Sequence, residues 1–193
     1  MDLLKLVSRE LIVHCLAVEF PGYGVYEGQA TAEWVIEDAE WVLEFVRKVM
    51  LWSSWDIIIC GRSIGSGPAC HLAARNEDLG ALALISPYKS IATIVKDSFG
   101  KFAGFLSHLV KERFVNIEEM ENVKCPTFFL HGKKDKLIPY QHSKDLKKTC
   151  KGPTFAHFPK TMDHNEFSFM YDLVEPLKYF LLKQRVLTDC INT

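Results

Sequence analysis

The stretch from Ile57 to Gly67 constrains the fold of this chain more than any other. An apolar run rich in β-branched residues leads into the pentapeptide GRSIG at 61–65, and a helix-compatible sequence follows. The segment is therefore predicted to form a strand, a tight turn and a helix. Glycines at 61 and 65 lack a Cβ, so strand and helix can approach closely and leave Ser63 at the apex. This is the local structure of a nucleophile elbow, and an ordinary glycine-rich loop that binds phosphate is the alternative.

Around this turn the chain alternates predicted helices and strands. Helices are expected at 2–11, 31–50, 63–76, 140–150 and 167–186, and strands at 12–20, 55–60, 81–86, 126–131 and 154–158. Strands joined by helices form parallel βαβ units, so the sequence predicts an α/β fold, a mostly parallel sheet with helices on both faces. We expect 12–20 to be a buried strand. Aromatic and apolar residues recur at helical spacing in 31–50: Trp34, Trp41, Phe45 and Val49, with Val35, Val42 and Val46. The tryptophans among them are expected to anchor the core.

Composition limits the class of protein. The 193 residues are 48% hydrophobic and 24% charged, which suits one sizeable core, and we expect a single domain over 1–193. The net charge of −1 disfavours a nucleic-acid partner. Six cysteines without a C-x-x-C pair indicate reduced thiols, and the sequence has neither a signal peptide nor an apolar run of about 18 residues. These features predict a cytoplasmic protein, with peripheral membrane contact left open.

Residues 91–114 interrupt the alternation. Phenylalanines and leucines recur there at helical spacing, and lysines and an arginine flank them. One interpretation is an amphipathic helix that packs against the sheet. The other is a small cap-like helical insertion that lines an apolar substrate pocket or touches a membrane surface. On the second interpretation Phe99 and Phe102 contact substrate, together with Tyr23 from the turn after the first strand.

A serine nucleophile needs a base, and the base needs an orienting carboxylate. Asp135 follows one predicted strand, and His164 follows the next. Both lie at carboxyl ends of strands, where they can converge with Ser63 in the order serine, acid, histidine. Asp163 is a rival acid, although neighbouring loop residues seldom point at one another, and His131 is expected to hold its loop. Because no H-x-x-x-H or C-x-x-C spacing is present, neither a metal nor a cofactor is predicted.

Several motifs together are similar to those of a known family. They are PGYG at 21–24, GRSIGSGPA at 61–69, SPYKSI at 86–91, HGKKD at 131–135 and HN at 164–165. The chain resembles the α/β-hydrolase superfamily, and within it the type-17 α/β-hydrolase domain-containing protein depalmitoylases and related membrane-associated hydrolases. The resemblance implies Ser63 as nucleophile, His164 as base, Asp135 as the orienting acid, and the backbone N–H of Ile64 as one oxyanion donor.

The resemblance is incomplete at the amino terminus. Members of the superfamily begin with strands that this chain lacks, and one of these lies between the PGYG strand and the elbow strand. The loop after that strand supplies the second oxyanion N–H. Without it, the strand at 12–20 and the elbow strand must close a gap or stay unpaired. We therefore expect an amino-terminally truncated chain, in which Met1 is an internal methionine of a longer reading frame.

Three functions remain open at this point. The first is a serine hydrolase that forms an acyl-enzyme on an ester or thioester, either a small acyl ester or an acylated protein such as a palmitoyl-protein, or a lipid ester. The second is an inactive or regulatory module that lacks half of the oxyanion hole. The third is a serine peptidase, because the same three residues support amide cleavage. The sequence best supports the first.

Overall fold

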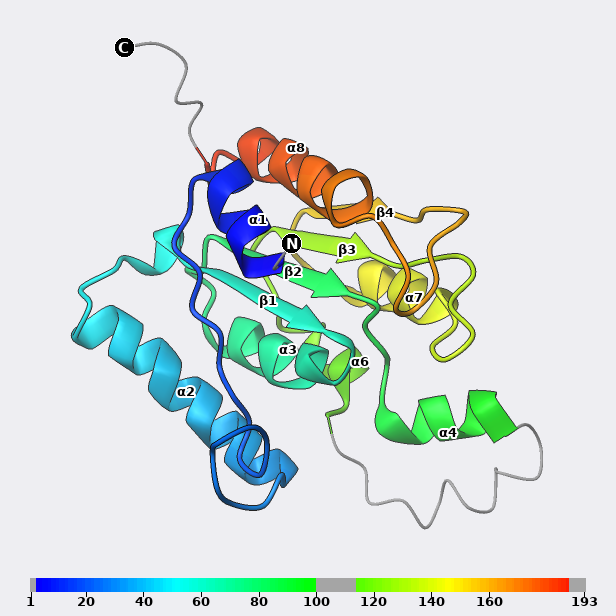
Figure 1. Cartoon of the computed structure of the whole chain (residues 1–193), viewed down its shortest axis with the longest axis horizontal. Helices are drawn as coiled ribbons and strands as arrows, with labels where there is room; N and C mark the ends of the chain where they lie inside the picture. The colour runs from blue at the N-terminus through cyan, green and yellow to red at the C-terminus, as the bar shows by residue number, and fades with distance from the viewer. Residues whose placement is uncertain (1–2, 100–113, 188–193) are drawn as a thin grey trace.

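A four-stranded parallel sheet forms the centre of the molecule. The computed structural model describes residues 3–99 and 114–187 (Figure 1). The strands are β1 (Ile58–Arg62), β2 (Ala81–Ile85), β3 (Thr127–Leu130) and β4 (Thr154–His157), and they lie side by side in chain order. All three pairings are parallel, which places the carboxyl ends of the four strands at one edge of the sheet. The predicted α/β fold is confirmed.

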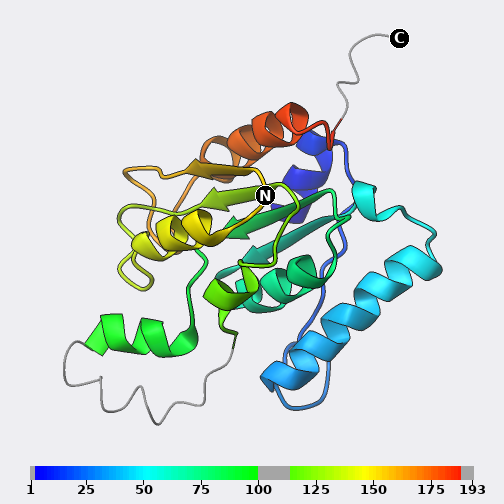
Figure 2. The ribbon, with the colours of Figure 1, turned by 180° about the vertical axis from the view of Figure 1, so that it is seen from behind.

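Helices cover both faces of this sheet (Figures 1 and 2). One face packs against α1 (Leu3–Leu11), the π-helical turn at Phe169–Val174 and α8 (Glu175–Lys183). The other packs against α2 (Ala32–Lys48), α3 (Ser66–Arg75), α6 (Asn116–Glu119) and α7 (Gln141–Thr149). Strand β2 shows why the sequence folds this way: Ala83 and Ile85 face the first layer, whereas Leu82 and Leu84 face the second. Apolar residues at every position suit a central strand buried on both sides.

The prediction of a buried strand at 12–20 is wrong. These residues form no strand, and Ile12 and Leu16 are largely exposed. A strand is stable only where its backbone N–H and C=O groups have partners. In the described part of the chain β1 pairs with β2 alone, and residues 14–20 make no backbone hydrogen bond to a strand. Of the two outcomes expected for residues 12–20 and the elbow strand, a closed gap or no pairing, the structure has the second.

The aromatic residues of α2 are also placed differently from the prediction. Trp41 is 64% exposed, and Trp34, Phe45 and Val49 are exposed as well. The helix instead buries its other apolar side, with Val35 and Leu43 at 5%. The helix itself is confirmed. Because it carries apolar residues around most of its circumference, however, the sequence does not reveal which side is buried.

Residues 91–114 are described only in part. Helix α4 (Ile91–Phe99) occupies the beginning of the expected insertion and projects from the carboxyl edge of the sheet (Figure 1). The remainder, including Phe102, lies outside the described residues, as does the side chain of Phe99. The cap-like role of the insertion therefore stays a prediction. No helix among residues 3–99 and 114–187 is both long and apolar enough to cross a bilayer.

Candidate active site

The turn after β1 holds Ser63 in a strained conformation. Ser63 has a φ of 51°, in the left-handed region that side chains other than glycine rarely adopt. A 3-10 turn, Ser63–Gly65, follows at once and leads into α3. A Cβ on Gly61 would lie 2.6 Å from the Gly65 carbonyl oxygen and 2.7 Å from the Ala69 Cβ, so only glycine fits there. Gly65 itself is in open space, so the close approach of strand and helix requires one glycine, not the two predicted.

Three loops bring Ser63, His164 and Asp135 together at the carboxyl edge of the sheet. The Ser63 hydroxyl lies 3.1 Å from His164 Nε2, and His164 Nδ1 lies 2.7 Å from an Asp135 carboxylate oxygen. With the proton on Nδ1, the imidazole donates to Asp135 and its Nε2 accepts from Ser63. The residues come from the ends of β1, β3 and β4, 101 and 29 positions apart along the chain. Such a chain of hydrogen bonds can remove the proton of the serine hydroxyl.

Asp135 is buried and accepts hydrogen bonds on both carboxylate oxygens. One oxygen receives the backbone N–H groups of Leu137 and Ile138, at 2.9 and 2.8 Å. The other, which bonds His164, also lies 3.2 Å from His131 Nε2. Burial alone would raise the pKa of Asp135, but hydrogen bonds from His131, His164 and the Ile138 amide outweigh it and hold the pKa well below its ordinary value. The carboxylate therefore stays ionised and fixes the orientation of His164.

His131 lies where the sequence placed it, at the end of β3, and holds the Asp135 loop. Its Nε2 is 2.8 Å from the Ile138 carbonyl oxygen, and its Nδ1 is 2.7 Å from the Ser143 hydroxyl. The side chains of His131 and Ser143 are fully buried. Ser143 was missed by sequence reasoning, because a serine on a lysine-rich helix gives no local signal of a buried contact.

The rival acid, Asp163, supports a turn. One of its carboxylate oxygens accepts the backbone N–H groups of Asn165 and Glu166, at 2.9 and 2.6 Å. These two hydrogen bonds lower the pKa of Asp163. Within the described residues no hydrogen bond or ion pair joins the Asp163 carboxylate to the His164 ring.

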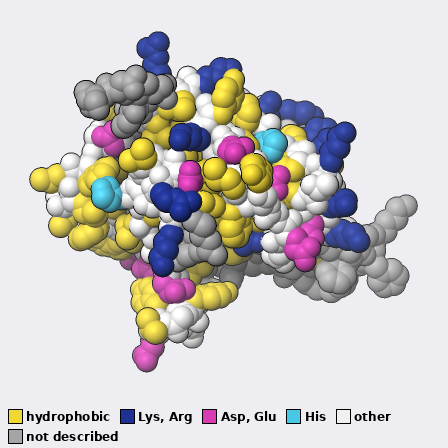
Figure 3. Space-filling model, turned by 45° about the horizontal axis from the view of Figure 1, so that its top comes forward, with side chains coloured by type: hydrophobic (Ala, Val, Ile, Leu, Met, Phe, Trp, Pro, Cys, Tyr) yellow, Lys and Arg dark blue, Asp and Glu magenta, His cyan; other side chains and the backbone are white. Residues whose placement is uncertain are grey.

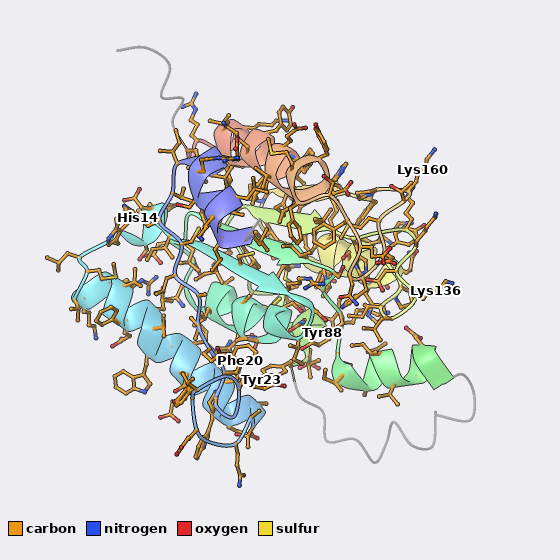
Figure 4. All side chains as sticks on the ribbon, viewed as in Figure 1. His14, Phe20, Tyr23, Tyr88, Lys136 and Lys160 are labelled. Carbon is orange, nitrogen blue, oxygen red and sulfur yellow. The ribbon has the colours of Figure 1, made fainter. Side chains whose placement is uncertain are left out.

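Two further residues predicted for the site, Ile64 and Tyr23, lie at different distances along the chain from Ser63. Ile64 directly follows Ser63 at the start of the turn, where backbone N–H groups have no partner within the helix and can face an oxyanion. Tyr23 lies in the loop before α2, 56% exposed, with its ring 6.3 Å from that of Phe20 (Figure 4). Within residues 3–99 and 114–187, no hydrogen bond, ion pair or ring contact joins Tyr23 to Ser63, and the role of Tyr23 in substrate binding stays a prediction. The same residues hold no group of three side chains arranged as metal ligands.

Comparison with solved structures agrees with this fold. Est1E from Butyrivibrio proteoclasticus, in a structure with bound ferulic acid, superimposes with a TM-score of 0.67 at 19% identity, over 86% of this chain and 75% of that one. The esterase domain of a Rhodothermus marinus protein gives a TM-score of 0.65 at 13% identity, over 95% and 79% of the two chains. Identities this low show the fold alone.

Comparison with related sequences identifies the family of this chain. The α/β-hydrolase domain-containing protein aho-3 of Caenorhabditis elegans is 28% identical over 84% of this chain and 47% of its own length. The α/β-hydrolase domain-containing protein 17B of Homo sapiens is 27% identical over 87% and 56%. The chain thus spans about half the length of these curated relatives. Residues 34–165 match the family model described as serine hydrolase (FSH1). With more than half of its length matched and with relatives of the type-17 kind, the chain belongs to the FSH1 family of α/β-hydrolase serine hydrolases.

Proposed function

We propose that this chain cleaves acyl esters or thioesters through an acyl-enzyme, with Ser63 as nucleophile, His164 as general base and Asp135 as its orienting acid. One observation carries the proposal: an unbroken chain of hydrogen bonds runs from the Ser63 hydroxyl through both nitrogens of His164 to Asp135. It begins at a strained elbow and ends at a carboxylate held ionised. A serine on a strained turn, a base within hydrogen-bond distance and an ionised carboxylate that orients the base are the three requirements of an activated serine.

In the first half-reaction, Ser63 Oγ bonds to the acyl carbonyl carbon while its proton passes to His164 Nε2. Negative charge gathers on the carbonyl oxygen, which faces the Ile64 backbone N–H. The carbonyl then re-forms, the bond to the alcohol or thiol breaks, and that group leaves with the proton from Nε2. Water repeats the sequence: its proton passes to Nε2, its oxygen bonds to the acyl carbon, and Ser63 leaves with the proton.

Apolar side chains around the site support an acyl substrate. Ile64 follows Ser63, Leu137 lies in the loop of Asp135, and Phe169 follows the loop of His164. The exposed fractions of these three side chains are 48%, 53% and 36%. Exposed apolar residues on or beside the loops that carry a polar site suit a ligand with a hydrocarbon chain. A palmitoyl-protein or a lipid ester is accordingly the specific candidate within the ester and thioester class.

The same loops carry positive charge. Four exposed lysines lie on the loops of Asp135 and His164, and we call them the lysine surface: Lys133, Lys134, Lys136 and Lys160. None forms an ion pair with a described residue. Backbone hydrogen bonds from Lys133 to Pro159 and from Lys134 to Met162 join the two loops. Several Lys and Arg side chains lie along one edge of the molecule (Figure 3), and Lys136 and Lys160 project on the same side in Figure 4. Around the exposed Leu137, this charge favours peripheral contact with an anionic lipid surface.

A fluorophosphonate probe tests the proposal directly, because it bonds covalently only to an activated serine. We expect the 193-residue chain to be labelled, and the variants Ser63→Ala and His164→Ala to lose labelling while they stay folded. A folded wild-type chain without labelling would support the inactive-module alternative. Turnover of acyl-thioester, lipid-ester and peptide substrates then separates the two functions, because only a peptidase cleaves the peptide substrate as well.

A further inference from the structure

Arg62, the residue immediately before Ser63, reaches the loop that carries His164. Its Nη2 donates two hydrogen bonds, to the backbone carbonyl oxygen of His164 at 2.8 Å and to the side-chain oxygen of Asn165 at 2.9 Å. Its guanidinium carbon also lies 5.9 Å from the ring centroid of Phe167. A single exposed side chain therefore contacts three residues of one short loop, more than 100 positions away in sequence.

The position of these contacts matters because of the strand order. Ser63 follows β1 and His164 follows β4, and these strands are the two edges of the described sheet, with β2 and β3 between them. No backbone hydrogen bond of the sheet fixes one relative to the other. The loop of His164 must cross the carboxyl ends of two strands before its imidazole reaches Ser63.

Two other sets of contacts hold this loop, and both come from the β3 side. Asp135 accepts from His164 Nδ1, and the backbone amides of Lys133 and Lys134 donate to Pro159 and Met162. These contacts orient the His164 ring, but all of their partners lie in the loop after β3. Among the described residues, the only hydrogen bonds that tie the loop backbone or its side chains to the β1 side, apart from the Ser63 contact itself, are those of Arg62.

We propose that Arg62 is a positioning residue for the reaction: it fixes the His164 loop against the elbow and so sets the distance from His164 Nε2 to Ser63 Oγ. This inference rests on the proposed function of Ser63. The guanidinium suits the task, since a planar, permanently charged donor can hold a carbonyl and an amide oxygen at once and stack on an aromatic ring. Arg62 touches no reacting atom in this scheme and acts through His164.

The test compares Arg62→Ala and Arg62→Lys with wild type and with Arg75→Ala. Arg75 is a matched control because, like Arg62, it donates to one side-chain oxygen and one backbone carbonyl, those of Glu119 and His71, away from Ser63. We expect Arg62→Ala to lower the maximal rate of fluorophosphonate labelling about 10- to 100-fold, with the probe's binding constant little changed, because a small misplacement of a base costs this much. Arg62→Lys should recover part of the rate, as should guanidinium ion added to Arg62→Ala at a concentration well below denaturing.

Amide hydrogen exchange supplies a readout that does not depend on activity. In Arg62→Ala, the peptide spanning 163–167 should exchange faster than in wild type, whereas the peptide spanning α7 should not change. Wild-type exchange at 163–167 together with a wild-type labelling rate would overturn the inference. If the wild-type chain were not labelled at all, the proposed function would fail, and the exchange experiment would still decide whether Arg62 holds the loop.

Discussion

The rings of His131 and His164 contact the same carboxylate oxygen of Asp135, at 3.2 and 2.7 Å. The two histidines have different surroundings. His131 is fully buried and bonded at both nitrogens, whereas His164 keeps one nitrogen for Ser63. One histidine therefore holds the carboxylate, and the other is held by it.

Substitution of His131 tests this division. We expect His131→Ala to lower the Ser63 labelling rate about tenfold, because a misoriented Asp135 misplaces His164. It should also destabilise the chain by about 1–3 kcal/mol, since the buried Ser143 hydroxyl loses its partner. Labelling rates, measured well below the melting temperature, and urea unfolding are the measurements. The exposed His14, exchanged for Ala, is the control, and equal effects of the two changes would contradict the assigned role.

Acid should weaken the fold through Asp135. Its pKa is lowered in the folded chain, so its contribution to stability is complete above its unfolded pKa of about 3.9 and is lost as the pH falls through and below that value. We expect the difference in unfolding free energy between wild type and Asp135→Asn to be largest near pH 7 and to shrink below about pH 4. Urea unfolding from pH 7 to pH 3 measures it, with Asp56→Asn as an exposed control. A difference that does not vary with pH would rule out this linkage.

The sequence was most informative where local chemistry decides structure. A strand, a glycine-rich turn and a helix are encoded within a dozen residues, so the elbow was predictable, as were the loops of Asp135 and His164 that follow β3 and β4. Burial depends on neighbours instead. Apolar content at 12–20 predicts a strand only if another strand lies beside it, and in the described residues none does. The contacts of Arg62 left no sequence signal because they join positions about 100 residues apart.

The two glycines of the elbow should respond differently to the same change. A Cβ on Gly61 would collide with Gly65, Ser66 and Ala69, whereas one on Gly65, which has a φ of −65°, meets nothing within 4 Å. Gly61→Ala should therefore destabilise the chain by about 1–3 kcal/mol, through overpacking, and displace Ser63 enough to abolish labelling. Gly65→Ala should be neutral in stability. Thermal melting and probe labelling of both variants check the pair, and equal sensitivity would contradict the steric argument.

Binding to lipid vesicles tests the lysine surface. The chain should sediment with vesicles that contain phosphatidylserine and not with phosphatidylcholine alone, and salt should release it, because screening weakens contacts between exposed charges. Changing Lys133, Lys134, Lys136 and Lys160 to Glu should abolish sedimentation. The same change at Lys178 and Lys183, two exposed lysines of α8, should have little effect. Vesicle binding that is independent of lipid charge, or lost equally in both variants, would exclude the lysine surface as the contact.

Opposite sides of α2 give the sharpest test of how this helix packs. Leu43 is 5% exposed and belongs to the core cluster of α3 and β2, whereas Trp41 is 64% exposed although it has the larger apolar side chain. Leu43→Ala should cost about 2–5 kcal/mol, because it leaves a cavity in that cluster. Trp41→Ala should change stability by no more than about 0.5 kcal/mol, as expected for a surface position. Urea unfolding of both variants measures the difference. If Trp41→Ala were the more damaging change, α2 would bury its tryptophans, as helical spacing alone predicts.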